Sequence, residues 1–159
     1  MATFKADMDA LSDLVSNLKL SDSSIEDILK SGGYIVTDAV RRSAETIPVR
    51  DGKHYNESMK ATGIPTYLKN SILMNLGLAK MQKKNGIYDV KIGFKNGYSK
   101  MKTKKWSSGV PIQMIVRSLE KGNSWMNKYP FVNKAFKSSQ KDCVEAMQNE
   151  LIRQVKGEE

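Results

Sequence analysis

The segment ILMNLGLAKMQKKNGIYDVKIGF, residues 72–94, carries the local pattern on which the fold prediction depends. Apolar side chains occupy alternate positions over residues 72–78 and again over residues 88–94. A period of two residues is typical of strands that bury one face. Between the two runs, Asn85-Gly86 tolerates the positive φ angles of a type I′ turn. The segment therefore predicts an antiparallel β-hairpin.

Helical patterns precede the hairpin. Apolar residues at spacings of three and four predict an amphipathic helix over residues 4–18. A second helix is expected to start near Ser21, whose hydroxyl can cap it, and to end near Thr46, two residues before a proline. Each glycine of Gly32-Gly33 costs a helix about 1 kcal/mol relative to alanine, so we expect a kink or break there. Residues 47–66 are predicted to form a long loop.

Two more helices are expected after the hairpin. A short one opens at Pro111, carries apolar residues on one side and ends at Gly122. A last one, of about 25 residues, opens at Pro130. Its predicted apolar stripe comprises Val132, Phe136, Cys143, Met147, Leu151 and Val155.

Helices, then a hairpin, then helices make an α+β arrangement. We expect N-terminal helices, a small antiparallel sheet built on the hairpin, and a long C-terminal helix packed on the sheet. Residues 1–31 are predicted to form an N-terminal helical arm and residues 32–159 an α+β domain. A chain of 159 residues, 40 % of them hydrophobic, can bury roughly two-thirds of its surface without disulfides.

The composition narrows the class of protein. A single cysteine excludes an internal disulfide, and no window approaches the ~18 apolar residues of a membrane span. The first residues lack the basic and then apolar pattern of a secretory signal. We therefore expect a protein kept in a reducing compartment, with no membrane contact.

The net charge of +9 is unevenly spread along the chain. Residues 1–39 carry three lysines against seven carboxylates, whereas residues 40–110 carry 15 basic residues against four acidic ones. A molecule with an acidic end and a basic middle can pair head to tail with copies of itself, or face a polyanion with one side.

The sequence offers no constellation of catalytic residues. His54, the single histidine, lies in the predicted loop, and Cys143 lies on an apolar stripe. Neither has sequence neighbours that would complete a metal site or a nucleophilic triad. Phosphate-binding glycine loops and nucleophile elbows are missing as well. We therefore expect neither an enzyme nor a cofactor or metal, and interpret His54 as a solvated residue and Cys143 as a buried thiol.

A strongly basic run over residues 95–109 holds the candidate partner-contacting residues, with Tyr98 and Trp106 among them. Three interpretations are open at this point. The run can contact DNA, with phosphates on the lysines and bases stacked on the aromatic rings. It can contact the acidic face of a protein, or it can be a solvated loop. The candidates are Lys95, Lys100, Lys102, Lys104 and Lys105.

Short motifs follow one another in a recognisable order along residues 33–157. They are Thr62-Gly63, Leu68-Lys69-Asn70-Ser71-Ile72, Val90-Lys91-Ile92-Gly93, Leu119-Glu120-Lys121-Gly122-Asn123-Ser124, and Tyr129-Pro130-Phe131-Val132-Asn133-Lys134-Ala135-Phe136. In this order the chain resembles the family of small phage tail-component proteins, the head–tail joining, neck or tail-completion proteins of long-tailed phages. The residues that carry the resemblance are Leu68, Ser71, Ile72, Gly93, Glu120, Gly122, Pro130, Phe131 and Ala135.

The resemblance implies a structural subunit of a ring between the head connector and the tail tube. The implied partners are copies of the same chain in a six-fold or twelve-fold ring, a head-closure or connector protein, and a tail tube or tail terminator protein. DNA passes through such an assembly, so we expect most lysines to face protein or solvent rather than grip the DNA. The implied location is the neck or tail of the virion, after assembly in the host cytoplasm. A basic nucleic-acid-binding module is the alternative function.

The motif residues also have structural interpretations of their own. Pro130 suits the first turn of a helix, and Phe131 is expected to be buried between the last helix and the sheet. Gly93 and Gly122 suit sharp turns. Glu120 lies near the C-terminus of a short helix, where the helix dipole disfavours a negative charge, so we expect a cationic partner for it.

Overall fold

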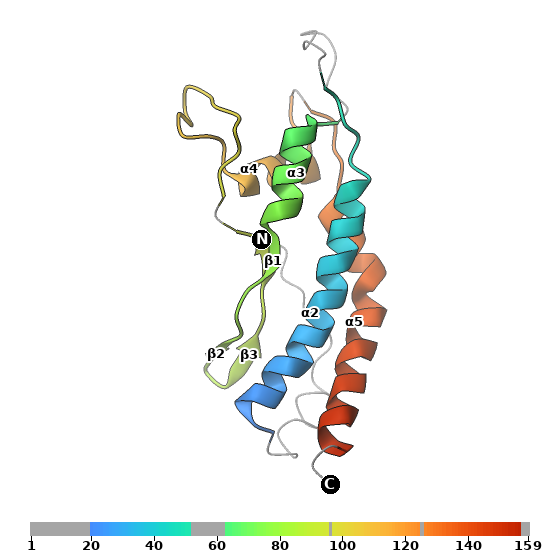
Figure 1. Cartoon of the computed structure of the whole chain (residues 1–159). Coiled ribbons are helices and arrows are strands. Elements are labelled where there is room, and N and C mark those ends of the chain that lie inside the picture. Colours follow the sequence, from blue (N-terminus) through green and yellow to red (C-terminus); the bar gives the residue numbers. More distant parts are fainter. Residues whose placement is uncertain (1–19, 52–62, 96, 125, 157–159) are drawn as a thin grey trace.

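The computed structural model describes residues 20–51, 63–95, 97–124 and 126–156. Within them, the helices are α2 (Asp22–Glu45), α3 (Thr66–Asn75), α4 (Ile112–Lys121) and α5 (Phe131–Lys156). The strands are β1 (Leu76–Leu78), β2 (Gln82–Lys84), β3 (Ile87–Asp89) and β4 (Ile92–Phe94). The long helices α2 and α5 lie side by side, and the strands, α3 and α4 lie on the other side of α2 (Figure 1). The predicted α+β class is confirmed.

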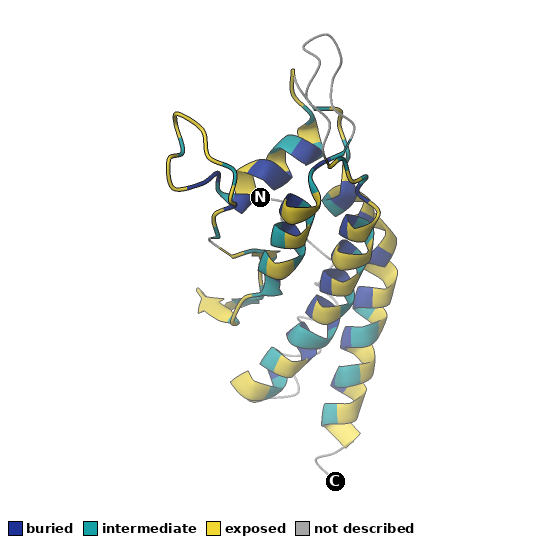
Figure 2. Cartoon of the chain, turned by 45° about the horizontal axis from the view of Figure 1, so that its top comes forward, coloured by how far each residue is buried: buried dark blue, intermediate teal, exposed yellow. Residues whose placement is uncertain are grey.

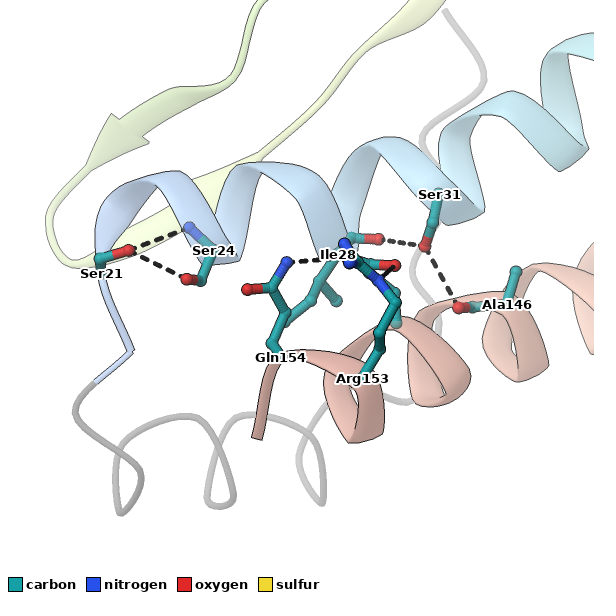
Figure 3. A network of polar contacts seen from close by, with 8 residues as sticks. Ser21, Ser24, Ile28, Ser31, Ala146, Arg153 and Gln154 are labelled. Atoms are coloured by element: carbon teal, nitrogen blue, oxygen red, sulfur yellow. Dashed lines mark hydrogen bonds and ion pairs between the residues drawn. The ribbon is translucent and has the colours of Figure 1, made fainter. Parts of the chain in front are cut away.

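The α2–α5 pair forms the centre of the core because both helices bury a residue at every fourth position. In α2 these residues are Ile28, Gly32, Val36, Val40 and Ala44, and in α5 they are Phe131, Ala135, Ser139, Cys143, Met147 and Leu151. Residues four apart form a ridge on a helix surface, and such ridges interlock when helices pack. The Ser31 hydroxyl also joins the pair, since its oxygen lies 2.7 Å from the Ile28 carbonyl oxygen and 3.2 Å from that of Ala146 (Figure 3).

Of the two alternatives at Gly32-Gly33, the break is wrong, because α2 runs as one long helix without interruption to its C-cap at Thr46. The two glycines instead let neighbouring elements approach the helix. A Cβ atom on Gly32 would lie 2.4 Å from Cε of Met147, and one on Gly33 would lie 2.7 Å from Cδ1 of Leu78. Packing on both sides therefore offsets the low helix propensity of the pair. The predicted cap is confirmed, since the Ser21 hydroxyl accepts a hydrogen bond from the Ser24 backbone N–H.

The first predicted strand is wrong over most of its length. Residues up to Asn75 belong to helix α3, and β1 comprises only the last three residues of the apolar run. In α3 the buried residues are Leu68 and Ile72, which are one helical turn apart. Met74, which the alternation placed on the buried face of a strand, is 81 % exposed. Burial of Leu68 and Ile72 on one face of a helix therefore decides the structure up to Asn75, in place of the strand that the alternation predicted.

The predicted hairpin turn is confirmed. Asn85 and Gly86 have φ angles of 53° and 78°, and they join β2 to β3. Below the tip the ladder is interrupted, and β1 then pairs with β4, with Gly77 opposite Gly93. The alternation predicted for residues 88–94 places Tyr88, Val90, Ile92 and Phe94 against the core, each of them partly buried.

Both helices predicted after the hairpin are present. Helix α4 lies between Pro111 and Gly122, and its expected apolar face is buried in full, namely Ile112, Ile115, Val116 and Leu119. Helix α5 begins directly after Pro130. Its stripe is confirmed at Cys143, Met147 and Leu151, but at its start the buried residues are Phe131 and Ala135 rather than Val132 and Phe136, which are partly buried. At its end, Val155 is exposed.

Two predictions concern residues that the structure does not describe, and a third concerns a domain boundary that falls within α2. The helix predicted over residues 4–18, and His54, lie outside the described residues. The boundary predicted between residues 31 and 32 falls inside α2, and Ile25, Ile28 and Leu29 belong to the same core as the rest of the helix. No helix in the described part of the chain is long and apolar enough to span a membrane.

Candidate interaction surface

The basic run forms a loop between β4 and α4, which we call the lysine loop and define as residues 95–109. It projects from the side of the molecule that carries α3 and α4, and it points away from α2 (Figure 1). All five candidate lysines belong to it, and all of them are exposed to solvent. The loop carries five lysines and no acidic residue.

Backbone hydrogen bonds close the base of the lysine loop. The Lys95 N–H donates to the Asn75 carbonyl over 2.7 Å, which ties the loop to the end of α3. The Ser99 N–H donates to Val110 over 2.9 Å, and the Val110 N–H donates to Met101 over 2.7 Å. The loop is therefore a hairpin held at its base by the elements on both sides.

A tight turn forms the tip of the lysine loop. Thr103 and Trp106 exchange backbone hydrogen bonds in both directions, over 3.2 and 3.0 Å. This pairing leaves Lys104 and Lys105 as the two residues at the turn. The Lys105 ammonium lies 5.8 Å from the centroid of the Trp106 ring, within the range of a cation–π contact.

The segment that leads to this turn alternates between exposed and buried residues. Ser99 is 4 % exposed, and Met101 packs against the core. Tyr98, Lys100 and Lys102, at the positions between and beside them, are exposed. The segment therefore presents a tyrosine and two lysines to solvent at every second residue.

The lysines of the loop form no ion pair among the described residues. The ion pairs there join Glu26 to Lys30, Asp22 to Lys83, Asp89 to Lys91, and Glu150 to Arg153. The sequence carries seven basic residues and no acidic one from residue 91 to residue 119, so this segment of the chain has a strong positive charge.

Gly109 closes the loop by a close approach that the sequence prediction did not include. Its φ angle is 114°, and a Cβ atom there would lie 2.1 Å from the Ser99 carbonyl oxygen. A positive φ of this size is accessible mainly to glycine. The glycine that ends the basic run is therefore the signal from which the closed base of the loop could have been inferred.

The family-motif residues form two packing junctions, and Glu120 stands at one of them. Its carboxylate accepts hydrogen bonds from the Val132 N–H over 2.6 Å and from the Asn133 side-chain amide, also over 2.6 Å. The expected cationic partner is wrong, because the carboxylate caps the N-terminus of α5 instead. The helix dipole favours a negative charge at that end.

The residues around Glu120 complete this junction. Gly122 has the positive φ, 70°, that the predicted turn requires. Phe131 and Ala135 are buried, and the Phe131 ring meets the Phe94 ring edge to face with centroids 6.3 Å apart. Phe131 therefore lies between the last helix and the sheet, as predicted.

The second junction lies at α3. Leu68 and Ile72 are buried there, and the Ser71 hydroxyl donates to the Tyr67 carbonyl of its own helix. Gly93 does not form the predicted turn, because it lies inside β4, opposite Gly77. The motif residues of both junctions hold elements together.

Long-range polar contacts that no local pattern predicts join the same elements. The Tyr129 hydroxyl donates to the Thr46 carbonyl over 2.8 Å, which attaches the end of α2 to the start of α5. The Asp51 carboxylate accepts from the Thr66 N–H over 2.8 Å and caps α3. The Lys69 ammonium donates to the Ile47 carbonyl over 3.1 Å, just past the end of α2.

The described residues contain no group of histidine, cysteine and carboxylate side chains that could hold a metal ion. Cys143 is buried in the α2–α5 interface, as predicted, and burial raises the pKa of its thiol. The charged surface that the described residues present is that of the lysine loop.

Comparisons with protein-family models, curated proteins and solved structures found no match to the chain.

Proposed function

We propose that this chain is a structural subunit of a phage neck or tail-completion ring. In this role it joins the head connector to the tail tube through protein–protein contacts around the DNA channel. The observation that carries the proposal is the lysine loop, a hairpin whose exposed lysines pair with no carboxylate among the described residues. The order of the motifs resembles that of phage tail-component proteins, and this resemblance is the reason for proposing a ring between head and tail.

The loop has the properties of a contact element. Hydrogen bonds to α3 and to Val110 hold its base, so binding a partner does not have to order a free chain. Its exposed lysines favour an acidic partner and increase the rate of encounter with one. Tyr98, which is 62 % exposed, adds an aromatic side chain of the type that is enriched at interfaces.

The positions of the motif residues agree with this proposal. Glu120, Phe131 and Ala135 join α4, α5 and β4, while Leu68 and Ile72 join α3 to the core. These contacts make a scaffold that holds a projecting loop in place. The partners in the proposed assembly are copies of this chain, a head-closure or connector protein, and a tail tube or tail terminator protein, in the neck of the virion.

Charge reversal of the loop in the phage that encodes the chain tests the proposal. The variant carries Lys100→Glu, Lys102→Glu, Lys104→Glu and Lys105→Glu. A matched control reverses four exposed lysines of α5, namely Lys134, Lys137, Lys141 and Lys156. We expect the loop variant to yield heads without attached tails in electron micrographs, and the control to yield tailed particles.

Two results would overturn the proposal. One is a normal yield of infectious tailed particles from the loop variant. The other is a firmly attached, working tail on particles that lack the chain altogether.

A nucleic-acid-binding module is the second candidate, and the segment before the loop tip favours it. Tyr98, Lys100 and Lys102 are all exposed there, so a base could stack on the ring while phosphates contact the ammonium groups. A DNA titration at two salt concentrations separates the candidates. Binding through phosphates weakens steeply with salt, and each lost lysine contact lowers the slope by roughly 0.9. Affinity that the loop variant loses, together with normal tail joining, would favour this second candidate.

A further inference from the structure

A second charged surface lies on the exposed face of α2. Asp27, Tyr34, Asp38 and Glu45 are all exposed, and Tyr34 is 58 % exposed. They follow one another at separations of seven, four and seven residues, close to whole helical turns, so they share one face of the helix. We call these four residues the acidic face.

The acidic face is negative and lacks ion pairs among the described residues. The carboxylates of α2 that form ion pairs are Asp22, with Lys83, and Glu26, with Lys30. Arg41 and Arg42 are exposed three and four residues from Asp38 and Glu45, so three carboxylates stand against two guanidinium groups there. Asp27 also acts at longer range on Arg153, which is itself paired with Glu150.

The lysine loop of the same molecule does not cover this face. The opposite side of α2 packs against α5, β1 and α3, and α3 lies between the lysine loop and α2 in both views (Figures 1 and 2). The two surfaces have opposite charge, and each has an exposed tyrosine among its charged residues, Tyr98 in the loop and Tyr34 on the helix. An aromatic centre with charged surroundings is a common arrangement at protein interfaces.

We infer that the lysine loop of one copy of the chain binds the acidic face of the next copy. Because the contact joins two different patches, it is heterologous, and repetition around an axis closes a ring. The inference rests on the proposed function and specifies its subunit contact. The lysines of the loop then lie against the carboxylates of the acidic face across the interface.

A charge-swap experiment with the full chain tests the contact. The loop-reversed variant carries Lys100→Glu, Lys102→Glu and Lys104→Glu, and the face-reversed variant carries Asp27→Lys, Asp38→Lys and Glu45→Lys. Each variant then has a loop and a face of the same sign. We expect the self-association of each to be at least about tenfold weaker than that of the wild-type chain, as measured by sedimentation at low salt.

Mixing the two variants gives the decisive result. The negative loop of one variant matches the positive face of the other, and the positive loop of the second matches the negative face of the first. An equimolar mixture should therefore associate by strict alternation, and so should a single chain that carries all six substitutions. A control with Asp142→Lys and Glu145→Lys on α5 should behave as the wild type, and circular dichroism establishes that each variant is folded.

The remaining outcomes are decisive as well. Folded variants whose mixture stays as dissociated as each variant alone would overturn the inference, as would a wild-type chain that does not associate at all. A loop-reversed variant that loses DNA affinity but is not rescued by the face-reversed variant would assign the loop to nucleic acid. The proposed function fails separately, if particles without the chain still carry working tails.

Discussion

The Glu120 carboxylate, at the end of α4, accepts a hydrogen bond of 2.6 Å from the backbone N–H of Val132, in the first turn of α5. The negative charge of Glu120 is unfavourable at the C-terminus of α4. It is favourable at the N-terminus of α5, where the helix dipole has its positive end. This contact fixes the direction in which the longest helix leaves the α4 junction.

Substitution of Glu120 should destabilise the whole fold. Glu120→Ala removes the cap of α5 and leaves three donors without this acceptor, namely the backbone N–H groups of Val132 and Asn133 and the Asn133 side-chain amide. We expect the free energy of unfolding to fall by about 1–2 kcal/mol. Urea denaturation measures the change. Glu145→Ala, on the exposed side of the same helix, is the matched control and should change stability by less than about 0.5 kcal/mol. Equal effects of the two substitutions would contradict the capping role.

Gly32→Ala distinguishes a glycine that breaks a helix from one that allows close packing. Helix propensity alone predicts a gain of about 1 kcal/mol. The structure predicts a net loss of about 1–2 kcal/mol, because the new Cβ would lie 2.7 Å from Cγ of Met147 and 2.9 Å from Sγ of Cys143. Thermal unfolding measures the sign, and a stabilised variant would contradict the close approach.

Gly93→Ala serves as the control for that experiment. A Cβ atom added at Gly93 would meet no atom within 4 Å, although this glycine is one of the residues that carry the motif resemblance. We expect a change in the free energy of unfolding within about 0.5 kcal/mol.

Gly109→Ala should open the base of the lysine loop while the helical core stays folded. The substitution places a Cβ against the Ser99 carbonyl at a φ that alanine disfavours. Hydrogen exchange at the Ser99 and Val110 amides should then accelerate, with unchanged exchange in the middle of α2. Ser107→Ala, at an exposed position of the same loop, should leave both rates unchanged.

The hairpin tip should detach from α2 in acid. The Tyr88 hydroxyl and the Lys83 ammonium donate to the Asp22 carboxylate over 2.6 and 3.1 Å, and these hydrogen bonds lower the pKa of Asp22. A lowered pKa means that the contact stabilises the fold above about pH 4 and is lost as the pH falls through the folded-state value. Chemical shifts of the Tyr88 ring should report this change below about pH 4.

Asp22→Asn provides the control for the acid experiment. It removes the charge at every pH, so the Tyr88 shifts should no longer change with the titration of this carboxyl. A wild-type profile in that variant would assign the transition to another group.

The junction residues differ in how far their sequence neighbours define their roles. Phe131 is buried as predicted, against a Phe94 ring that lies far away along the chain. Gly122 behaves as predicted because a positive φ after a helix depends on a few adjacent residues. Gly93 and Glu120 do not, since their roles depend on the strand and the helix N-terminus that lie opposite them.

The sequence by itself determined the features that restrict the backbone locally. These are the Asn85-Gly86 turn, the start of α4 after Pro111, and the start of α5 after Pro130. Only the tertiary structure decided that α2 continues through Gly32-Gly33 and that residues up to Asn75 form a helix. The reason is physical: those outcomes depend on atoms of Met147, Leu78 and the surrounding core, which lie far away along the chain and meet these residues only in the folded state.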